Sequence, residues 1–416
     1  MKESETAAQF DVVIVGAGMV GASLACALAE TGLRIAVLDS QAIEVRDVSS
    51  DSFDPRVSAI TAASQAFFRS LGVWDAIMAR RASPYTDMHV WEADGTGSIH
   101  FSATAIHADV LGHIVENSVI LAALHERLMR YDNVTLLSPV TLSALRSPVA
   151  VTDAGTQGLV QLSLADDRHL STSLLVAADG ANSRVRELAG FNTREWDYEH
   201  HAIVTTVRTE LPHQQTAIQR FMDEGTLAFL PLCQDGGAEP NDQHYCSIVW
   251  SVLPDYAHSL MALDDRHFAQ ALQGAIENRL GDIADVDKRY SFPLRQRHAA
   301  GYVQNGIALI GDAAHTIHPL AGQGVNLGLL DASALAKEIS QAHAVGRSFA
   351  DQRTLRRYQR RRIGHNLGMM WMMEGFKQLF ADQPLPLRWL RNAGMTALDR
   401  TAPLKNRIMR SAMGIE

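Results

Sequence analysis

The chain has 416 residues, of which 47% are hydrophobic and 20% are charged. This composition is ordinary for a soluble globular protein with a large core, and at about 100–200 residues per domain the length predicts two or three domains. The formal net charge of -9 argues against wholesale binding to nucleic acid, and no run in the sequence is apolar and long enough to span a bilayer.

Cysteine usage and the N-terminus predict the compartment. Cys26, Cys233 and Cys246 lie in neither a metal-binding nor a redox spacing, which favours small buried residues in a reducing compartment. Residues 1–10 are polar and include acidic side chains, unlike a signal peptide. We therefore expect a cytoplasmic protein.

The first predicted elements are a strand, a glycine-rich turn, a helix and a second strand. They cover residues 11–15, residues 16–21 (Gly-Ala-Gly-Met-Val-Gly), residues 22–30 and residues 34–38. A lone GxGxxG is weak evidence, but this order of elements is the context that the dinucleotide-binding fingerprint requires.

Each residue of the fingerprint has its own task. Gly16 permits the tight turn, Gly18 lets the backbone approach a pyrophosphate, and Gly21 permits close packing of helix on strand. Asp39, at the end of the second strand, can accept hydrogen bonds from a ribose diol. Because this carboxylate would repel a ribose phosphate, the site suits FAD or NAD better than NADP.

Less specific patterns follow along the chain. Residues 55–71 predict a short extended segment and then a helix, and Arg56 in this segment is either a cofactor contact or a solvated arginine before the helix. Residues 86–102 alternate between apolar and polar side chains around two glycines, which predicts a β-hairpin. Residues 111–130 predict a helix that starts near Asn117.

A second turn with an acid and a glycine follows the predicted strand over residues 174–177. Residues 178–186 read Ala-Asp-Gly-Ala-Asn-Ser-Arg-Val-Arg, so that Asp179 and Gly180 follow the strand and Arg184 lies near the start of a helix. The alternative is a capped helix with surface arginines and no ligand.

From about residue 197 to residue 294 the pattern changes to repeated short strands. We expect strands over 202–208, 227–231 and 246–252, and a helix over 264–279. This arrangement predicts a mostly antiparallel sheet, inserted into the first domain as a second one.

The third turn is the most distinctive stretch of the chain. A short apolar run over 307–310 leads into residues 311–326, which contain three glycines and a proline, and a helix is expected over 327–339. Close approach of glycine backbone and the N-terminus of a helix suit an extended anionic or polar cofactor, although a tight connection without a ligand is the alternative. His315 and His318 have the spacing of a metal pair, but no third ligand is in view, so we expect no metal.

The C-terminal part of the chain has its own composition. Six arginines occur within residues 353–362, and methionines and aromatic residues crowd 369–380. Such a segment could touch a membrane surface or an apolar substrate. The favoured interpretation is an amphipathic helix packed on its own domain.

Together, GAGMVG, ADGANSRVR and GDAAHTIHPLAGQGVNLG, in this order, resemble the flavin-dependent aromatic hydroxylases of group A, which share the hydroxybenzoate-hydroxylase fold. Longer stretches are similar to the ubiquinone-biosynthesis hydroxylase family, and most similar to its 2-polyprenylphenol 6-hydroxylase branch: DPRVSAITAAS, LGVWDAI, RRASPY, LGHIVENSVI, WDYEHHAIVTTVRTE and AFLPL. The stretch LPLRWLRNAGMTALDR is at least as similar to the sister demethoxyubiquinone hydroxylase branch.

The resemblance implies an α/β fold, in which a Rossmann-like FAD-binding domain carries an inserted, mostly antiparallel β-sheet substrate domain and a helical C-terminal tail. The expected FAD-binding domain has three parts, residues 1–82, 105–190 and 295–345. The expected substrate domain combines a hairpin over 83–104 with residues 191–294, and the C-terminal helical region covers 346–416.

The resemblance also implies a cofactor site, residue by residue. Gly16, Gly18 and Gly21 would hold the FAD pyrophosphate, Asp39 would bind the adenosine ribose, and Arg56 would lie against the flavin side of the cofactor.

The second and third motifs would complete this site. Asp179 and Gly180, supported by Arg184, would serve both FAD and the pyrophosphate of the nicotinamide cofactor, while Gly311 and Asp312 would meet the ribityl chain. The stretch that passes the isoalloxazine ring would comprise Pro319, Gly322, Gln323, Gly324, Val325 and Asn326, the last two with N–H groups toward the pyrimidine edge. His318 is a weak candidate for a proton-handling catalytic residue, with a structural role as the alternative.

The implied reaction uses NAD(P)H, FAD and O2 to hydroxylate ring position C5 of a polyprenylphenol in ubiquinone biosynthesis, through a C4a-hydroperoxyflavin. Implied partners are other ubiquinone-biosynthesis proteins or a lipid-binding protein, with peripheral contact to the inner membrane. Open alternatives are the sister demethoxyubiquinone hydroxylase, another flavoenzyme with the same FAD domain, and a non-catalytic FAD-binding subunit.

Overall fold

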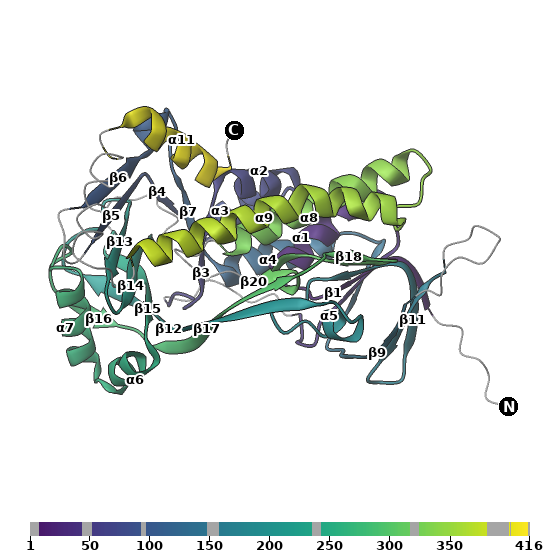
Figure 1. Ribbon diagram of the computed structural model, residues 1–416, viewed down its shortest axis with the longest axis horizontal. Coiled ribbons are helices and arrows are strands. Elements are labelled where there is room, and N and C mark those ends of the chain that lie inside the picture. The colour runs from purple at the N-terminus through teal and green to yellow at the C-terminus, as the bar shows by residue number, and fades with distance from the viewer. Residues whose placement is uncertain are drawn as a thin grey trace.

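The computed structural model describes residues 8–43, 52–92, 97–147, 158–234, 243–316, 324–380, 399 and 401–414. Two large sheets lie at opposite ends of the molecule, and two long strands and a long helix run between them (Figure 1). No helix in these ranges is long and apolar enough to cross a bilayer.

An eight-stranded sheet forms the centre of one part of the molecule. Its strands follow the order β18 (Val303–Gln304), β19 (Ile307–Leu309), β11 (His169–Ala177), β1 (Ala8–Val15), β2 (Ile35–Leu38) and β8 (Val134–Leu137), with β10 (Val160–Leu164) on β11 and β9 (Leu142–Arg146) on β10. The pairs among β19, β11, β1, β2 and β8 are parallel. The ends of β1, β2, β11 and β19 nearest the carboxyl edge are buried apolar runs, as the sequence predicts.

Helices pack against this sheet and against one another. The helix α1 (Met19–Ala29) contacts α4 (Asn117–Leu128) and α8 (Gly324–Ala344), and α9 (Gln352–Phe380) lies along α8 (Figure 1). Three short helices, α2 (Ala62–Ser70), α3 (Trp74–Arg80) and α5 (Arg184–Leu188), complete this part.

A strand that was not predicted comes before one predicted helix. The helix, expected within residues 111–130 with a start near Asn117, is confirmed from Asn117 to Leu128. Residues 112–116 instead form the strand β7 (Gly112–Glu116), the middle strand of a small sheet with β3 (Val57–Ile60) and β4 (Ser83–Tyr85). The segment Gly-His-Ile-Val-Glu has two partner strands, and this tertiary pairing overrides its continuity with the following helix.

The second large sheet has nine strands. Their order is β20 (His315–Thr316), β17 (Tyr290–Ala299), β12 (Thr193–Thr209), β15 (Tyr245–Val252), β14 (Gly225–Leu232), β13 (Thr216–Met222), β5 (Asp87–Glu92) and β6 (Ser98–Ser102), with β16 (Ile283–Val286) on β12. All pairs are antiparallel except that of β13 with β5. This sheet, the parallel one and the C-terminal helices confirm the predicted fold class.

The second sheet packs against two helices on one face. These are α6 (Pro254–Ala262) and α7 (Asp265–Ala275), and they enclose a second core around Trp250 and Phe268. The helix predicted over 264–279 is therefore confirmed, with a slightly earlier end. The last helix is α11 (Ala402–Met413), whose Met409 and Met413 pack on residues 103–111.

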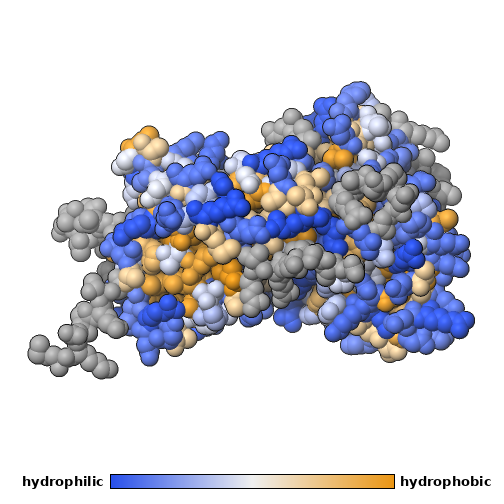
Figure 2. All heavy atoms as spheres, turned by 180° about the vertical axis from the view of Figure 1, so that it is seen from behind, coloured by the Kyte–Doolittle hydropathy of each residue, from blue (hydrophilic) through white to orange (hydrophobic). Residues whose placement is uncertain are grey.

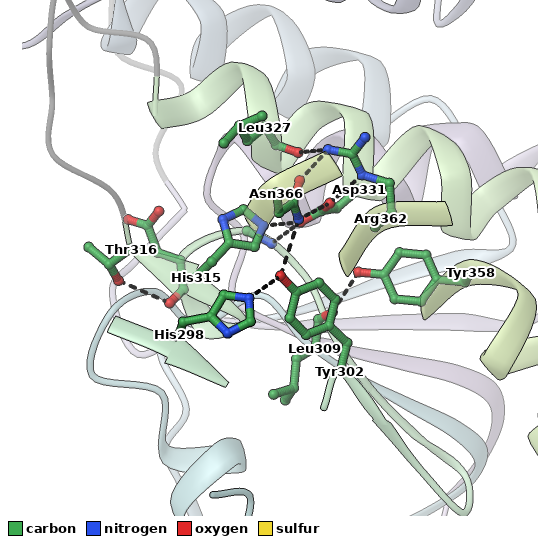
Figure 3. Close-up of polar contacts among 12 residues, drawn as sticks. His298, Tyr302, Leu309, His315, Thr316, Leu327, Asp331, Tyr358, Arg362 and Asn366 are labelled. Atoms are coloured by element: carbon green, nitrogen blue, oxygen red, sulfur yellow. Dashed lines mark hydrogen bonds and ion pairs between the residues drawn. The ribbon is translucent and has the colours of Figure 1, made fainter. Parts of the chain in front are cut away.

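A buried polar network fixes the third glycine-rich turn to the two long helices (Figure 3). Asp331 on α8 has no exposed surface, and its carboxylate accepts four hydrogen bonds. The donors are Gly311 N at 3.1 Å, His315 Nε2 at 2.5 Å, Arg362 Nε at 2.7 Å and Asn366 Nδ2 at 3.1 Å. Arg362 and Asn366 lie on α9, so one carboxylate joins three separate segments.

Charge is what holds this network together. Burial by itself would raise the pKa of Asp331, but the neighbouring His315 and Arg362 and their hydrogen bonds lower it below its usual value. Burial, reinforced by the charges of His315 and Arg194, lowers the pKa of nearby His298 to about 4, so its ring is neutral near pH 7. Its Nε2 contacts the hydroxyl of Tyr302 at 2.9 Å, which in turn accepts from Asn366.

We predict that Asp331→Asn destabilises the fold. The amide keeps the size of the side chain but removes its charge, and Arg362 would then be buried without a counter-charge. The free energy of unfolding, measured by urea titration with circular dichroism, should fall by about 3–5 kcal/mol.

The matched control is Asp166→Asn, which breaks an exposed pair with Arg168 and should change the free energy of unfolding little. If the Asp331 variant were as stable as this control, the network would not hold the three segments together.

Candidate cofactor site

The three glycine-rich turns of the sequence meet at one edge of the parallel sheet. Val15 is paired with Leu38 and with Ala177, and Ala177 is paired with Leu309. The carboxyl ends of four strands therefore lie side by side, and the residues that follow each strand emerge together. In open α/β sheets this edge is where ligands bind.

The first turn has close contacts at two glycines and open space at the third. Gly16 has a φ of +107°, and a Cβ there would lie 2.2 Å from the carbonyl oxygen of Ala178. A Cβ at Gly21 would lie 2.0 Å from the carbonyl oxygen of Gly16. At Gly18, the N-cap of α1, no atom of the described residues lies within 4 Å of such a Cβ, and none of their side chains caps the helix. The N–H groups of the first turn of α1 thus face a free space suited to a pyrophosphate.

Asp39 follows β2 at the same edge. One of its carboxylate oxygens accepts from Ala17 N at 2.7 Å and the other from Gln41 N at 2.8 Å. Each carboxylate oxygen can accept a further hydrogen bond, so the side chain can still bind hydroxyl groups of a ribose.

The second turn presents an incompletely bonded acid. Asp179 Oδ2 accepts from Val185 N at 3.1 Å, while its buried Oδ1 has no partner among the described residues. Gly180 has a φ of +79° and open space around its Cβ position. A buried carboxylate oxygen is costly to leave unbonded, so this atom indicates a missing donor at the site.

The arginine that joins the second turn to the third is Arg186. Arg184 instead pairs with Glu187 at 2.7 Å on the surface. The buried guanidinium of Arg186 donates to the carbonyl oxygens of Ala181 at 2.7 Å and Ala313 at 2.9 Å. The sequence holds both arginines two positions apart, and two such residues lie on different faces of a helix, so only the structure identifies the inner one.

Asp312 of the third turn lines the same space. Its side chain is exposed, yet protein surrounds it closely enough that loss of hydration raises its pKa, an effect that the nearby charges of His315 and Arg56 oppose. Arg56 is exposed as well, and its guanidinium lies 5.4 Å from the ring centre of Phe292 on β17. Asp312 and Arg56 thus lie within electrostatic reach of each other, near the junction of the two large sheets.

The helix α8 begins close to these residues. Gly324 is its first residue, and Val325 and Asn326 follow in its first turn, where N–H groups have no intrahelical partner. The Asn326 side chain itself is buried, accepting from Thr61 N at 3.2 Å and donating to Ala59 O at 2.7 Å. It anchors the start of the helix and leaves the backbone N–H groups to face a ligand.

A residue that the sequence analysis did not assign holds α8 against α1. A Cβ at Gly328 would lie 2.7 Å from Val20 and 3.1 Å from the Cα of Gly311. A glycine inside a helix costs about 1 kcal/mol of stability relative to alanine. Its presence within the predicted helix is therefore the sequence signal that could have indicated this close contact.

Part of the predicted site lies outside the described residues, namely His318, Pro319, Gly322 and Gln323. Among the residues that are described, no three His, Cys, Asp or Glu side chains lie close enough together to hold a metal ion.

The residues present fit FAD. The free space above Gly18, the unbonded oxygen of Asp179, the acid Asp39 and the first turn of α8 offer groups for a pyrophosphate, a ribose and a polar ring along one edge. The extended shape of a dinucleotide cofactor can meet all of them.

Known proteins resemble the chain over nearly its full length. A family model described as "FAD binding domain" matches residues 9–370. The 3-demethoxyubiquinol 3-hydroxylase of Escherichia coli is 36% identical over 97% of this chain and 98% of its own. The mitochondrial ubiquinone biosynthesis monooxygenase COQ6 of Xenopus tropicalis is 34% identical over 97% of this chain and 93% of its own.

Solved structures agree on the fold. The p-nitrophenol 4-monooxygenase PnpA of Pseudomonas putida superimposes with a TM-score of 0.75, at 19% identity, over 98% of both chains. The match to the family model, together with relatives above 30% identity over nearly the whole length, shows that this chain belongs to the FAD binding domain family, as an FAD-dependent aromatic-ring monooxygenase.

Proposed function

We propose that this chain hydroxylates ring position C5 of a polyprenylphenol in ubiquinone biosynthesis, using FAD, NAD(P)H and O2. The observation that carries the proposal is the convergence of three cofactor turns at one sheet edge, beside a second sheet that can hold a substrate. The choice of pathway rests on full-length likeness to relatives named for ubiquinone biosynthesis.

In this proposal the three turns divide the cofactor among them. Gly16, Gly18 and Gly21 would leave room for the pyrophosphate, with Asp39 on the adenosine ribose and Asp312 on the ribityl chain. When bound, FAD would supply the redox chemistry of hydroxylation, with NAD(P)H as the source of electrons and O2 as the source of the oxygen atom.

The protein then contributes electrostatics and exclusion of water. N–H groups of Val325 and Asn326 at the start of α8 would place positive potential at the pyrimidine edge of the flavin, where negative charge develops on reduction. Arg56 would add a positive charge on the same side. A site closed to water protects the oxygen-transfer step from loss as hydrogen peroxide.

The substrate would be held between the two sheets. The junction there contains Phe292 under Arg56, and Phe292 packs on the buried side chains of Ala202 and Leu294. An aromatic head group suits such surroundings, and its prenyl tail would need a continuous apolar passage. We propose the same domain division as the sequence implies, with residues 83–104 and 191–294 on the substrate side.

A second candidate is the sister reaction, hydroxylation of demethoxyubiquinol. It is favoured by the E. coli relative, which carries that name and matches almost end to end. We further propose peripheral contact with the inner membrane, or a lipid-binding partner, because a polyprenylated substrate is too apolar to travel through water.

Gly18→Val should weaken FAD binding at least about ten-fold, equivalent to about 1.4 kcal/mol, because the branched side chain would occupy the path of the pyrophosphate. Flavin content after purification and FAD titration by fluorescence quenching measure this. Gly274→Val is the matched control. Gly274 also has open space around its Cβ position, but it lies on α7, which packs on the nine-stranded sheet. Equal flavin content in both variants would reject the site.

Asp179→Ala should slow reduction of the flavin by NAD(P)H about ten-fold in stopped-flow traces, with a smaller effect on FAD affinity. The reason is that one oxygen of its carboxylate caps the start of α5, while the other has no partner among the described residues and is available to a cofactor. Ser183→Ala removes the other cap of α5 and is the control. If both variants were reduced at equal rates, Asp179 would act only as a cap.

A strain lacking this gene should stop making ubiquinone and accumulate a precursor. Lipid extracts analysed by mass spectrometry distinguish the candidates, and complementation with this gene should restore the quinone. A precursor without the C5 oxygen supports the polyprenylphenol substrate, and demethoxyubiquinone supports the sister reaction. Normal ubiquinone, with no redundant hydroxylase in the strain, would reject both.

A further inference from the structure

Positive charge is concentrated in the C-terminal part of the chain. Residues 346–416 contain 14 of the 37 lysines and arginines but only 5 of the 46 aspartates and glutamates, a net charge of +9. Residues 1–345 therefore carry a net charge of -18. Such asymmetry in an acidic protein indicates an anionic partner for the basic part.

The helix α9 displays this charge on one exposed face. Arg353, Arg356 and Arg360 are exposed, and so is Trp371, at 73% of its surface. Eighteen residues separate Arg353 from Trp371, which is five helical turns and about 27 Å along the helix, so both side chains leave the same side. Gly364 and Gly368 lie between them, and no described atom outside the helix backbone lies within 4 Å of their Cβ positions, so this stretch of the face is open. We call it the Arg–Trp face.

The opposite side of α9 holds the helix in place. Leu355 and Tyr358 are fully buried, Tyr358 donates to Leu309 O at 2.7 Å, and Arg362 and Asn366 join the network of Asp331. The favoured sequence interpretation, packing on its own domain, is therefore correct for this side. The Arg–Trp face is consequently presented on a rigid support, the long helix α9 that runs across the molecule in Figure 1.

The ion pairs of α9 within the described residues leave out the three arginines of this face. Arg357 and Arg361 pair with Glu338 on α8, at 2.6 and 3.2 Å. Arg353, Arg356 and Arg360 form no ion pair within the part of the chain that the structure describes. A hollow of about 500 Å³ lies among Arg353, Arg356, Arg357, Gln359 and Arg360. It can accommodate phosphate groups without breaking an existing pair.

We infer that the Arg–Trp face docks on an anionic lipid surface, with α9 lying in the plane of the headgroups. Arginines attract anionic headgroups, and an exposed tryptophan is suited to the interface between headgroups and acyl chains. Such docking would give the enzyme access to a substrate dissolved in the bilayer. Only this purpose, and not the docking itself, rests on the proposed function.

The opposite face of the molecule is different in character. Seen from behind, apolar side chains gather in a hollow on the half that contains the eight-stranded sheet, and charged side chains cover much of the rest (Figure 2).

The test is flotation of the FAD-loaded protein with vesicles of phosphatidylcholine, alone or with about one-third phosphatidylglycerol. Binding should require the anionic lipid and fall as salt is raised. Replacing the three unpaired arginines with glutamine should weaken binding on the order of a hundred-fold at low salt. The matched control replaces three exposed arginines elsewhere with glutamine, namely Arg34, Arg208 and Arg266, and should bind like the wild type.

Depth of insertion gives a second readout. Brominated lipids should quench part of the protein's tryptophan fluorescence, and that part should be missing in Trp371→Phe. Flavin content and melting temperature, unchanged in every variant, separate this test from the proposed enzymatic function. Equal binding to neutral and anionic vesicles, or by the two triple variants, would overturn the inference. So would capture of an acidic protein by this face in the absence of vesicle binding.

Discussion

The buried carboxylate of Asp331 is the interaction on which the rest of the molecule depends. It takes hydrogen bonds from the turn after β19, from β20 and from α9, and it lies on α8 itself. A charge removed from water is stable only when such donors surround it. Its position therefore determines where Gly311 and Asp312 lie relative to the first turn, and also orients the helix that carries the Arg–Trp face.

The parallel sheet supplies the second constraint. Strands that run in the same direction end at the same edge, so three turns widely separated in the sequence become neighbours. Close contacts at Gly16, Gly21 and Gly328 then bring backbone against backbone, while the absence of neighbours at Gly18 leaves room for a ligand. Tightly packed and open positions alternate within a few residues, and together they form a binding site for an extended ligand.

Much of this could be predicted from the sequence because it is local. Apolar runs that end in glycine and an acid specify strand, turn and helix within about twenty residues, and the family resemblance that these motifs carry implied the fold class. The choice between Arg184 and Arg186, by contrast, depends on which side of a five-residue helix faces the core. The pairing of Asp331 with Arg362 and Asn366 joins residues more than thirty positions apart, and no local pattern reveals it. The strand β7 was missed for the same reason, since its partners lie in other segments.

In the proposed reaction, the cofactor site uses O2 to hydroxylate a prenylated phenol. The most direct measurement is the reaction of the FAD-loaded protein with NAD(P)H and candidate ring substrates under isotopically heavy O2, followed by mass spectrometry of the product. The account predicts one heavy oxygen atom in the new ring hydroxyl, with consumption of NAD(P)H matched to product. Hydrogen peroxide as the only product, or a ring oxygen that comes from water, would contradict it.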